Sequence, residues 1–193
     1  MLKTARVLSP LIGLAALVLP CWSFGQATGE WHSVLGLGLV QNKPLHGTGD
    51  TAIYRSEFFH IYTGARYQQG ADAAVQITVG YQKASTGDAQ SQTQITFRRV
   101  PMEVLSSMKV APQLWLGWGL RYAPFAEIYG ATTAARSFSP GTGLILEAEI
   151  PHVDQANEHI AYCLRYVRES YKEHTGEPIN GSHIGVFMRF GGW

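Results

Sequence analysis

The chain has 193 residues, of which 46% are hydrophobic and 15% are charged, and its formal net charge is +1 at pH 7. A nearly neutral chain lacks the excess of basic residues that is typical of nucleic-acid-binding domains, so we expect no nucleic-acid partner. After residue 27 there is no run of 18 consecutive apolar residues, which excludes a transmembrane helix in that region. Cys163 is the one cysteine of the same region, so no intrachain disulfide is expected.

The first 27 residues have the three-part pattern of a secretory signal peptide. Two basic residues come first, an apolar run follows from Leu11 to Leu19, and Pro20 and small residues come next. The apolar run is shorter than the ~20 residues that a membrane-spanning helix needs. A lipoprotein anchor at Cys21 is the alternative, although a preceding proline fits such a site poorly. We predict a signal peptide over 1–27 and one exported domain over 28–193.

Eight segments then follow in which apolar residues alternate with polar residues or glycine. A period of two places successive side chains on opposite faces, which is the pattern of a β-strand with two different surroundings. In AAVQITVGYQ, for example, Val75, Ile77 and Val79 share one face, and polar residues and glycine share the other. In chain order the segments are 31–40, 57–68, 73–82, 92–105, 113–122, 142–150, 158–169 and 183–190.

The fourth segment, QTQITFRRVPMEVL, loses this phase part-way along. Its first half places Ile95 and Phe97 on the apolar face and Arg98 on the polar face. Pro101 has no N–H to donate to a neighbouring strand, so a β-bulge at this residue would explain the break. We therefore expect a bulge at Pro101.

The connections between the eight segments alternate between long and short. Outer-membrane barrels have short turns at the periplasmic rim, longer loops outside, and both chain ends in the periplasm. The longer connections are 41–54, 83–91, 123–141 and 172–181, and the shorter ones are 69–72, 106–112 and 151–157. This order indicates an up-and-down arrangement with the longer connections outside. Loops 41–54 and 123–141 are the predicted contacts for an extracellular partner.

The two faces of these segments differ in content. One face consists almost wholly of Leu, Ile, Val and Phe, whereas the other mixes glycine with Arg, Glu, Gln and His. A soluble barrel would keep its apolar face inside, but a charged face suits the interior of a barrel in lipid. The predicted fold class is all-β, an eight-stranded antiparallel up-and-down transmembrane β-barrel. The aromatic residues predicted to lie at the membrane interfaces are Trp31, Tyr67, Tyr81, Tyr122 and Tyr166.

Charged residues of the polar face are predicted to fill the barrel. An eight-stranded barrel has an interior just wide enough for side chains, and buried charges need partners of opposite sign. We interpret these residues as a salt-bridged plug that stabilises the barrel, and a narrow ion or small-solute channel is the alternative. The predicted network consists of Arg66, Arg98, Glu103, Arg121, Glu147, Glu149, Arg165, Glu169 and Arg189.

The segment HIGVFMRF fits the assembly signal of bacterial outer-membrane barrels. That signal has a polar residue first, glycine third, an apolar residue sixth and an aromatic residue eighth, places that are taken here by His183, Gly185, Met188 and Phe190. It implies the barrel-assembly machinery as a partner during biogenesis. The sequence departs from the usual pattern because Gly191–Trp193 follow the aromatic residue.

Three stretches carry a family likeness: ITFRRVPMEVL, LWLGWGLRYAP and LRYVRESYK…INGSHIGVFMRF. Within them, Arg99-x-Pro101-x-Glu103 and the run from Arg165 to Tyr171 are the more particular motifs. Across 28–193 the chain resembles the small eight-stranded outer-membrane β-barrel family, the OmpA- and OmpX-like group, and especially its proteobacterial members. The resemblance implies a bacterial outer-membrane location, with membrane lipid and lipopolysaccharide as surroundings, but little about activity. We expect a monomer.

No catalytic constellation stands out. A hydrolase pair of His and Ser on one strand face needs a spacing of two, and none of the four histidines in the predicted strands has a serine two places on. Loop residues His46, Asp50, Ser85 and Asp88 leave a lipid A-modifying enzyme as a third reading. Since no metal-ligand spacing, phosphate loop or nucleotide fingerprint is found, no metal or cofactor is predicted.

Overall fold

The computed structural model describes residues 29–42, 57–87, 94–130, 135–153, 159–172 and 178–191. Among these residues, no helix is long and apolar enough to cross a membrane. The predicted signal peptide, 1–27, lies outside the described residues. The strands are β1 (Gly29–Asn42), β2 (Glu57–Gln69), β3 (Ala73–Gly87), β4 (Gln94–Ala111), β5 (Leu114–Gly130), β6 (Arg136–Ser137), β7 (Gly141–Val153), β8 (His159–Lys172), β9 (Pro178–Asn180) and β10 (His183–Gly191).

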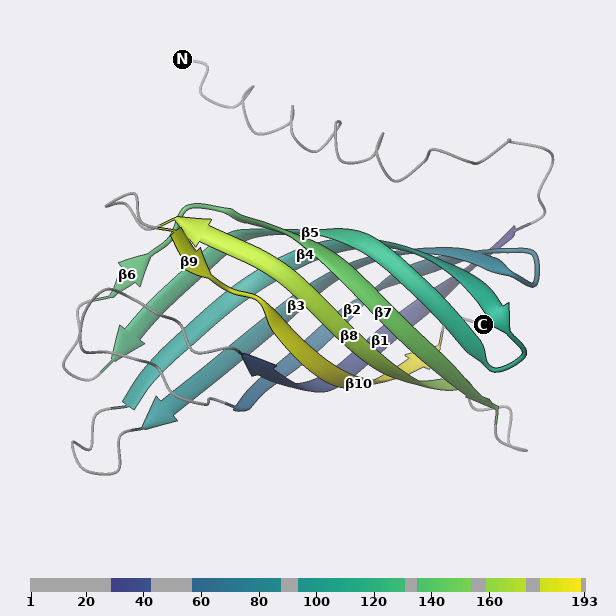
Figure 1. The fold of residues 1–193 in the computed structure, drawn as a ribbon, viewed down its shortest axis with the longest axis horizontal. Coiled ribbons are helices and arrows are strands. Elements are labelled where there is room, and N and C mark those ends of the chain that lie inside the picture. The colour runs from purple at the N-terminus through teal and green to yellow at the C-terminus, as the bar shows by residue number, and fades with distance from the viewer. Residues whose placement is uncertain are drawn as a thin grey trace, which may run out of the picture.

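The strands form one closed antiparallel barrel (Figure 1). Each long strand pairs with the next long strand, and the ring closes because β10 pairs with both β8 and β1. Leu37 of β1, for example, lies opposite Met188 on one side and Ile61 on the other. The short strands β6 and β9 extend the pairing at the ends of β5 and β8. The eight long strands confirm the predicted fold class.

The connections separate the barrel into two ends. The chain turns at 70–72 between β2 and β3, where Gly70 has a φ of +64° that favours glycine, and again at 112–113 between β4 and β5. The start of β1 and the finish of β10 lie at this same end, which we call the turn end (Figure 1). The strand ends that the longer connections join lie at the opposite end, which we call the loop end. In an outer-membrane barrel, the loop end faces outward from the cell.

Two connections are shorter than predicted because β4 and β5 are long. β4 continues to Ala111, so the predicted connection 106–112 is reduced to a tight turn. β5 continues to Gly130 and pairs there with both β4 and β6, so much of the predicted loop 123–141 is strand. Continued pairing satisfies backbone N–H and C=O groups that a loop within a membrane would leave without partners.

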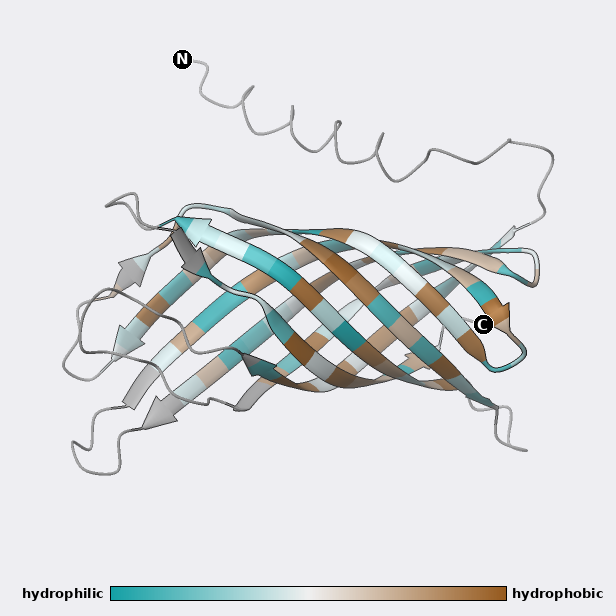
Figure 2. Ribbon diagram, in the orientation of Figure 1, coloured by the Kyte–Doolittle hydropathy of each residue, from teal (hydrophilic) through white to brown (hydrophobic). Residues whose placement is uncertain are grey.

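The wall is apolar on the outside and the interior is polar, as predicted. Brown and teal segments alternate along the strands in Figure 2. Outward side chains such as Leu39 and Val186 are 68% and 61% exposed, whereas Arg66 and Arg121 are completely buried. An exposed belt of leucine and valine is unfavourable in water but matches hydrocarbon, and the wall therefore has the polarity of a barrel in lipid.

The irregularity predicted at Pro101 is present between Val100 and Met102, but the additional residue lies on β5 and not on β4. The alternation of buried and exposed residues on β4 runs through the proline without a break. Opposite it, the two steps from Val100 to Met102 correspond to three steps on β5, from Phe125 to Tyr122. The additional residue is therefore accommodated on β5, which has a proline of its own in this interval.

The predicted orientations of Phe97 and Arg98 are wrong for the same reason. Because β4 has no additional residue at Pro101, alternation counted back from Glu103 places the side chains of Phe97 and Arg99 inward and that of Arg98 outward. Phe97 is 6% exposed and Arg99 is completely buried. Arg98 instead forms an ion pair on the wall with Glu127 of β5, and its side chain is 40% exposed.

Candidate functional site

The barrel interior is the largest gathering of charged side chains among the described residues. Five arginines there are at most 1% exposed, and four glutamates are at most 4% exposed. Along each strand, alternate side chains point inward. The inward charged side chains lie on six different strands. The interior set comprises Arg66 (β2), Arg99 and Glu103 (β4), Arg121 (β5), Glu147 and Glu149 (β7), Arg165 and Glu169 (β8), and Arg189 (β10).

Glycines facing inward make room for these large side chains. A Cβ atom added at Gly36 would lie 2.0 Å from the ring of Tyr62, and one added at Gly38 would lie 2.2 Å from the ring of Phe187. Both rings in turn pack against the Arg165 guanidinium, whose carbon lies 5.0 Å from the Tyr62 centroid and 4.9 Å from that of Phe187. The glycine-rich inward face of β1 therefore permits aromatic and charged groups to fill the lumen.

Near the turn end, Glu149 is the acceptor for two arginines. Arg189 donates to both of its carboxylate oxygens, at 2.5 and 2.6 Å, and Arg66 donates to one of them at 3.0 Å. The Arg66 guanidinium also lies over the ring of Trp115, 5.2 Å from its centroid. The two arginines come from β2 and β10, whereas Glu149 comes from β7, so this group spans the lumen.

In the middle of the barrel, Glu103 joins two arginines. It accepts from Arg121 at 2.8 Å and from Arg165 at 2.7 Å, one on each carboxylate oxygen. Arg165 also donates from Nε to Glu147 at 2.6 Å. Gln82 of β3 continues the chain of contacts, because its amide oxygen accepts from Arg121 at 2.9 Å.

Near the loop end, Arg99 is the centre of a further set of contacts. Its guanidinium donates to Glu169 at 2.7 Å, to the Tyr171 hydroxyl at 2.9 Å and to Gln82 at 2.7 Å. Its Nη2 lies 2.9 Å from Nδ1 of His183. Glu169 also contacts Arg121 at 3.3 Å, so the middle and loop-end groups form one network.

An aromatic layer covers this network at the loop end. The rings of Phe97, Phe138 and Tyr171 lie with centroids 6.1 to 6.4 Å apart. Phe138 follows β6 and is 7% exposed. Two backbone hydrogen bonds hold it in place. The Phe138 N–H donates to the Ala126 carbonyl at 3.0 Å, and the Ser139 N–H donates to the Lys172 carbonyl at 2.9 Å. The segment after β6 thus folds into the mouth of the barrel.

The arrangement favours arginine over a metal ion. Glu147, Glu149 and Cys163 bring three possible ligand atoms within 4.8 Å of one another. Both carboxylates, however, already accept hydrogen bonds of 2.5 to 2.6 Å from Arg165 and Arg189. A cation bound there would have to separate buried guanidinium groups from these carboxylates, which costs several kcal/mol. We assign no metal to this cluster.

Eight of the nine residues predicted for the interior network lie in it, and Arg98 is the exception. Arg99 was not predicted to belong to the network, although counting back from Glu103 along the strand in steps of two residues leads to it. The hydrogen bonds of Gln82 and His183 to the network were also not predicted. The sequence shows that such residues are polar and face inward, but not which side chain each one contacts.

The predicted interfacial aromatics all face outward, and the rings of Trp31 and Tyr67 pack in a tilted arrangement with centroids 5.1 Å apart. Tyr81, Tyr122 and Tyr166 lie about halfway along their strands and not near the ends, because β3, β5 and β8 continue to Gly87, Gly130 and Lys172. In the predicted assembly signal, Met188 and Phe190 face outward, and His183 and Gly185 face inward. Its role in assembly stays a prediction.

The structure does not bring the loop residues considered for a lipid A-modifying enzyme into a catalytic arrangement among the described residues. Ser85 shares a hydrogen bond of 3.2 Å with Thr96 on the neighbouring strand. His46, Asp50 and Asp88 lie outside the described residues.

No protein-family model and no curated protein matches the sequence. Among solved structures, the chain is similar to a Neisserial surface protein, NspA, with a TM-score of 0.54 and 11% identity over 84% of this chain and 97% of that one. It also matches Ail of Yersinia pestis, with a TM-score of 0.46 and 15% identity over 85% and 97% of the two chains. A third match is the outer membrane protein AlkL, with a TM-score of 0.45 and 10% identity over 89% and 92%. The likeness to NspA confirms the predicted resemblance at the level of the fold, and with the apolar wall it supports an outer-membrane location.

Proposed function

We propose, from the premise that this chain has the fold of a small eight-stranded outer-membrane β-barrel, that it is an integral outer-membrane protein with a closed lumen. Its role is then structural, or an interaction made by its outer surface, and it does not transport solutes. The observation that carries the proposal is the ion-pair network across the lumen, covered by an aromatic layer at the loop end.

The network leaves little freedom for a conducting path. Each of the four interior glutamates accepts from an arginine at 2.7 Å or less, and the partners of each pair come from different strands. An ion passing through would have to separate such pairs in a low-dielectric interior, where a charge without its partner costs several kcal/mol. An eight-stranded barrel has no spare width beside its side chains to offer another route.

The test is conductance in planar lipid bilayers. We expect the wild-type protein to give no discrete current steps, and Glu147→Gln, which weakens one pair without adding volume, to behave in the same way. Barrel formation in each sample is checked by the shift in mobility on SDS gels between boiled and unboiled protein. Regular steps in the wild-type protein, altered by Glu147→Gln, would support the narrow channel instead.

The outer surface of the loop end is the proposed place for an extracellular partner. Most of loop 41–54 lies outside the described residues, as does 131–134 of the second predicted loop. In the second loop, β5 extends to Gly130 and the segment around Phe138 is folded inward, which leaves a smaller surface than the sequence predicted. Binding of cells or purified surface proteins to the barrel, with and without residues 131–134, would test this role.

A further inference from the structure

The outward side of the wall carries its charges at one end. Along the described strands, five charged residues in the outward phase have described side chains, four of them basic, and all lie toward the loop end. They are Lys83, Arg98, Glu127, Arg168 and Lys172. In a barrel in lipid, these side chains meet the headgroups of the leaflet on the loop side. Their positive excess favours anionic headgroups there.

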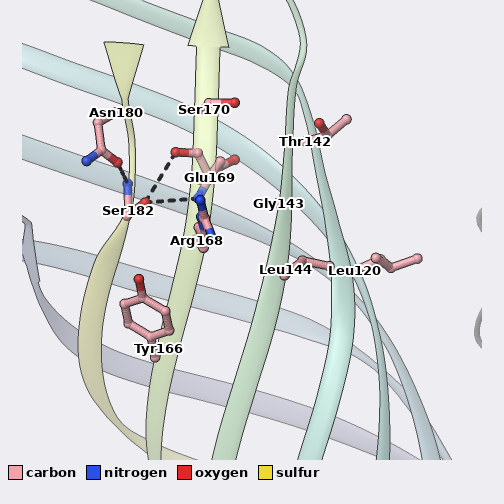
Figure 3. Close-up of a pocket in the computed structure, with 10 residues that line it drawn as sticks. All are labelled: Leu120, Thr142, Gly143, Leu144, Tyr166, Arg168, Glu169, Ser170, Asn180 and Ser182. Atoms are coloured by element: carbon pink, nitrogen blue, oxygen red, sulfur yellow. Dashed lines mark hydrogen bonds between the residues drawn. The ribbon is translucent and has the colours of Figure 1, made fainter. Parts of the chain in front are cut away.

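One of these residues lies in a groove of about 770 Å³ on the wall (Figure 3). The groove crosses β5, β7, β8 and the join between β9 and β10. Its lower part is apolar, with Leu120 and Leu144 side by side and Tyr166 on the next strand, and its upper part carries Arg168 and Ser170. A charged end and an apolar end are thus arranged along the direction in which a lipid molecule lies.

Beside the groove, the β9–β10 join replaces the regular pairing of β10 with β8, which begins only at His183. Ser182 replaces part of the backbone ladder with its side chain: its hydroxyl accepts from Glu169 N–H at 3.2 Å and donates to the Glu169 carbonyl at 3.4 Å. The Ser182 N–H donates to the side chain of Asn180 at 2.9 Å. From the inside, Arg99 donates to the Gly181 carbonyl at 3.4 Å and holds the same join. The floor of the groove is therefore fixed before any ligand binds.

Arg168 differs in its partners from Arg98 and from the five interior arginines. Arg98, also outward, is paired with Glu127, and the interior arginines are paired with glutamates. No described carboxylate lies within ion-pair distance of Arg168. An outward arginine at the edge of an apolar belt is best satisfied by the phosphate oxygens of a lipid, which its planar guanidinium can bind through two parallel hydrogen bonds.

We propose that this groove binds one phosphate-bearing lipid of the membrane. Arg168 binds the phosphate, the Ser170 hydroxyl donates a further hydrogen bond, and the acyl chain lies along Leu120, Leu144 and Tyr166. A membrane lipid is the occupant because the groove opens on the lipid-facing wall and joins a basic end to an apolar end. The inference rests on the membrane location in the proposed function but not on a closed lumen.

The experiment is native mass spectrometry of the refolded barrel in detergent with added bisphosphorylated lipid A. The wild-type protein is expected to retain one lipid A, and to bind the same lipid without phosphates about tenfold more weakly. Arg168→Gln should weaken lipid A binding about tenfold and leave binding of the dephosphorylated lipid unchanged. Lys83→Gln is the matched control: it removes one outward positive charge at the loop end of β3, which does not border the groove, and should change binding less than about twofold.

Equal losses for the Arg168→Gln and Lys83→Gln proteins would overturn the proposal, since general surface charge would then explain the binding. Equal binding of lipid A and its dephosphorylated form would also overturn it, as would displacement of lipid A by millimolar inorganic phosphate. Arg168→Lys keeps the charge but not the planar fork, and should bind between the wild type and Arg168→Gln. It carries the test if Arg168→Gln shows no mobility shift on SDS gels. If the protein conducts but still binds lipid A, the closed lumen is rejected and the lipid site stands. If the wild-type protein shows no mobility shift, the barrel itself is rejected.

Discussion

Arg98 and Arg99 are neighbours in sequence but lie on opposite sides of the barrel wall. Arg98 pairs with Glu127 on the wall, where both side chains keep some exposure, and Arg99 pairs with Glu169 in the lumen, where both are completely buried. Water or headgroups can replace the outer partner, whereas nothing in a filled lumen can replace the inner one. The difference shows that the energetic weight of an ion pair in this barrel depends mainly on which face of the strand it occupies.

The largest expected effect comes from removing a shared interior carboxylate. Glu149→Gln keeps the size of the side chain but leaves Arg66 and Arg189 without the negative charge that both contact. We expect the free energy of unfolding to fall by about 3–5 kcal/mol, the usual cost of breaking a buried pair. Urea unfolding in lipid vesicles, followed by tryptophan fluorescence, measures it. A loss below about 1 kcal/mol would contradict the contrast between lumen and wall.

A smaller effect is expected from crowding the lumen. Gly36→Ala places a Cβ atom 2.0 Å from the Tyr62 ring, whereas Gly117→Ala places one 3.4 Å from Leu105, an ordinary contact distance. Overpacking of a filled core costs about 1–3 kcal/mol, so Gly36→Ala should be less stable by that amount and Gly117→Ala close to wild type. The same unfolding assay compares them. Equal stability of the two variants would mean that the lumen is more compliant than its contacts indicate.

The smallest effect is expected on the wall. Arg98→Gln removes the ion pair with Glu127 and the contact of Arg98 with the rings of Phe125 and Tyr129, whose centroids lie 5.5 and 5.3 Å away. Because this site is exposed, we expect no measurable change in the urea midpoint. Arg99→Gln, one residue on, should lower the midpoint clearly. Similar midpoints for both variants would remove the distinction between the two faces.

The strand pattern was predictable because burial alternates along most of each strand. Val75, Ile77 and Val79 needed no structural information to be placed on the apolar face. β4 was harder, since two successive arginines at 98 and 99 fit either phase and Pro101 made a bulge there plausible. The additional residue was on β5 instead, where the sequence also contains a proline. The alternation of polar and apolar residues shows that the pairing becomes irregular near Pro101, but it does not show which of the two paired strands contains the additional residue.

The particular ion pairs could not be predicted in the same way. Glu103 and Arg165 are 62 residues apart and meet only through the stagger of the closed barrel, which alternation does not specify. Phe138 was also beyond prediction, because its position depends on the hydrogen bond to Ala126 and not on a periodic pattern. The composition of the lumen could be read from the sequence, whereas its connectivity could not.

The group formed by Arg66, Arg189 and Glu149 has a consequence for the rate of unfolding. Arg66 and Glu149 are 83 residues apart, on β2 and β7, which lie on opposite sides of the ring. Their contact crosses the lumen and requires a sheet curled into a barrel, so we expect it to form late in folding and to be lost when the seam between β1 and β10 opens. Interactions that are absent from the transition state slow unfolding without slowing folding. We therefore expect the turn-end charges to slow the opening of the closed barrel more than they affect the rate at which it closes.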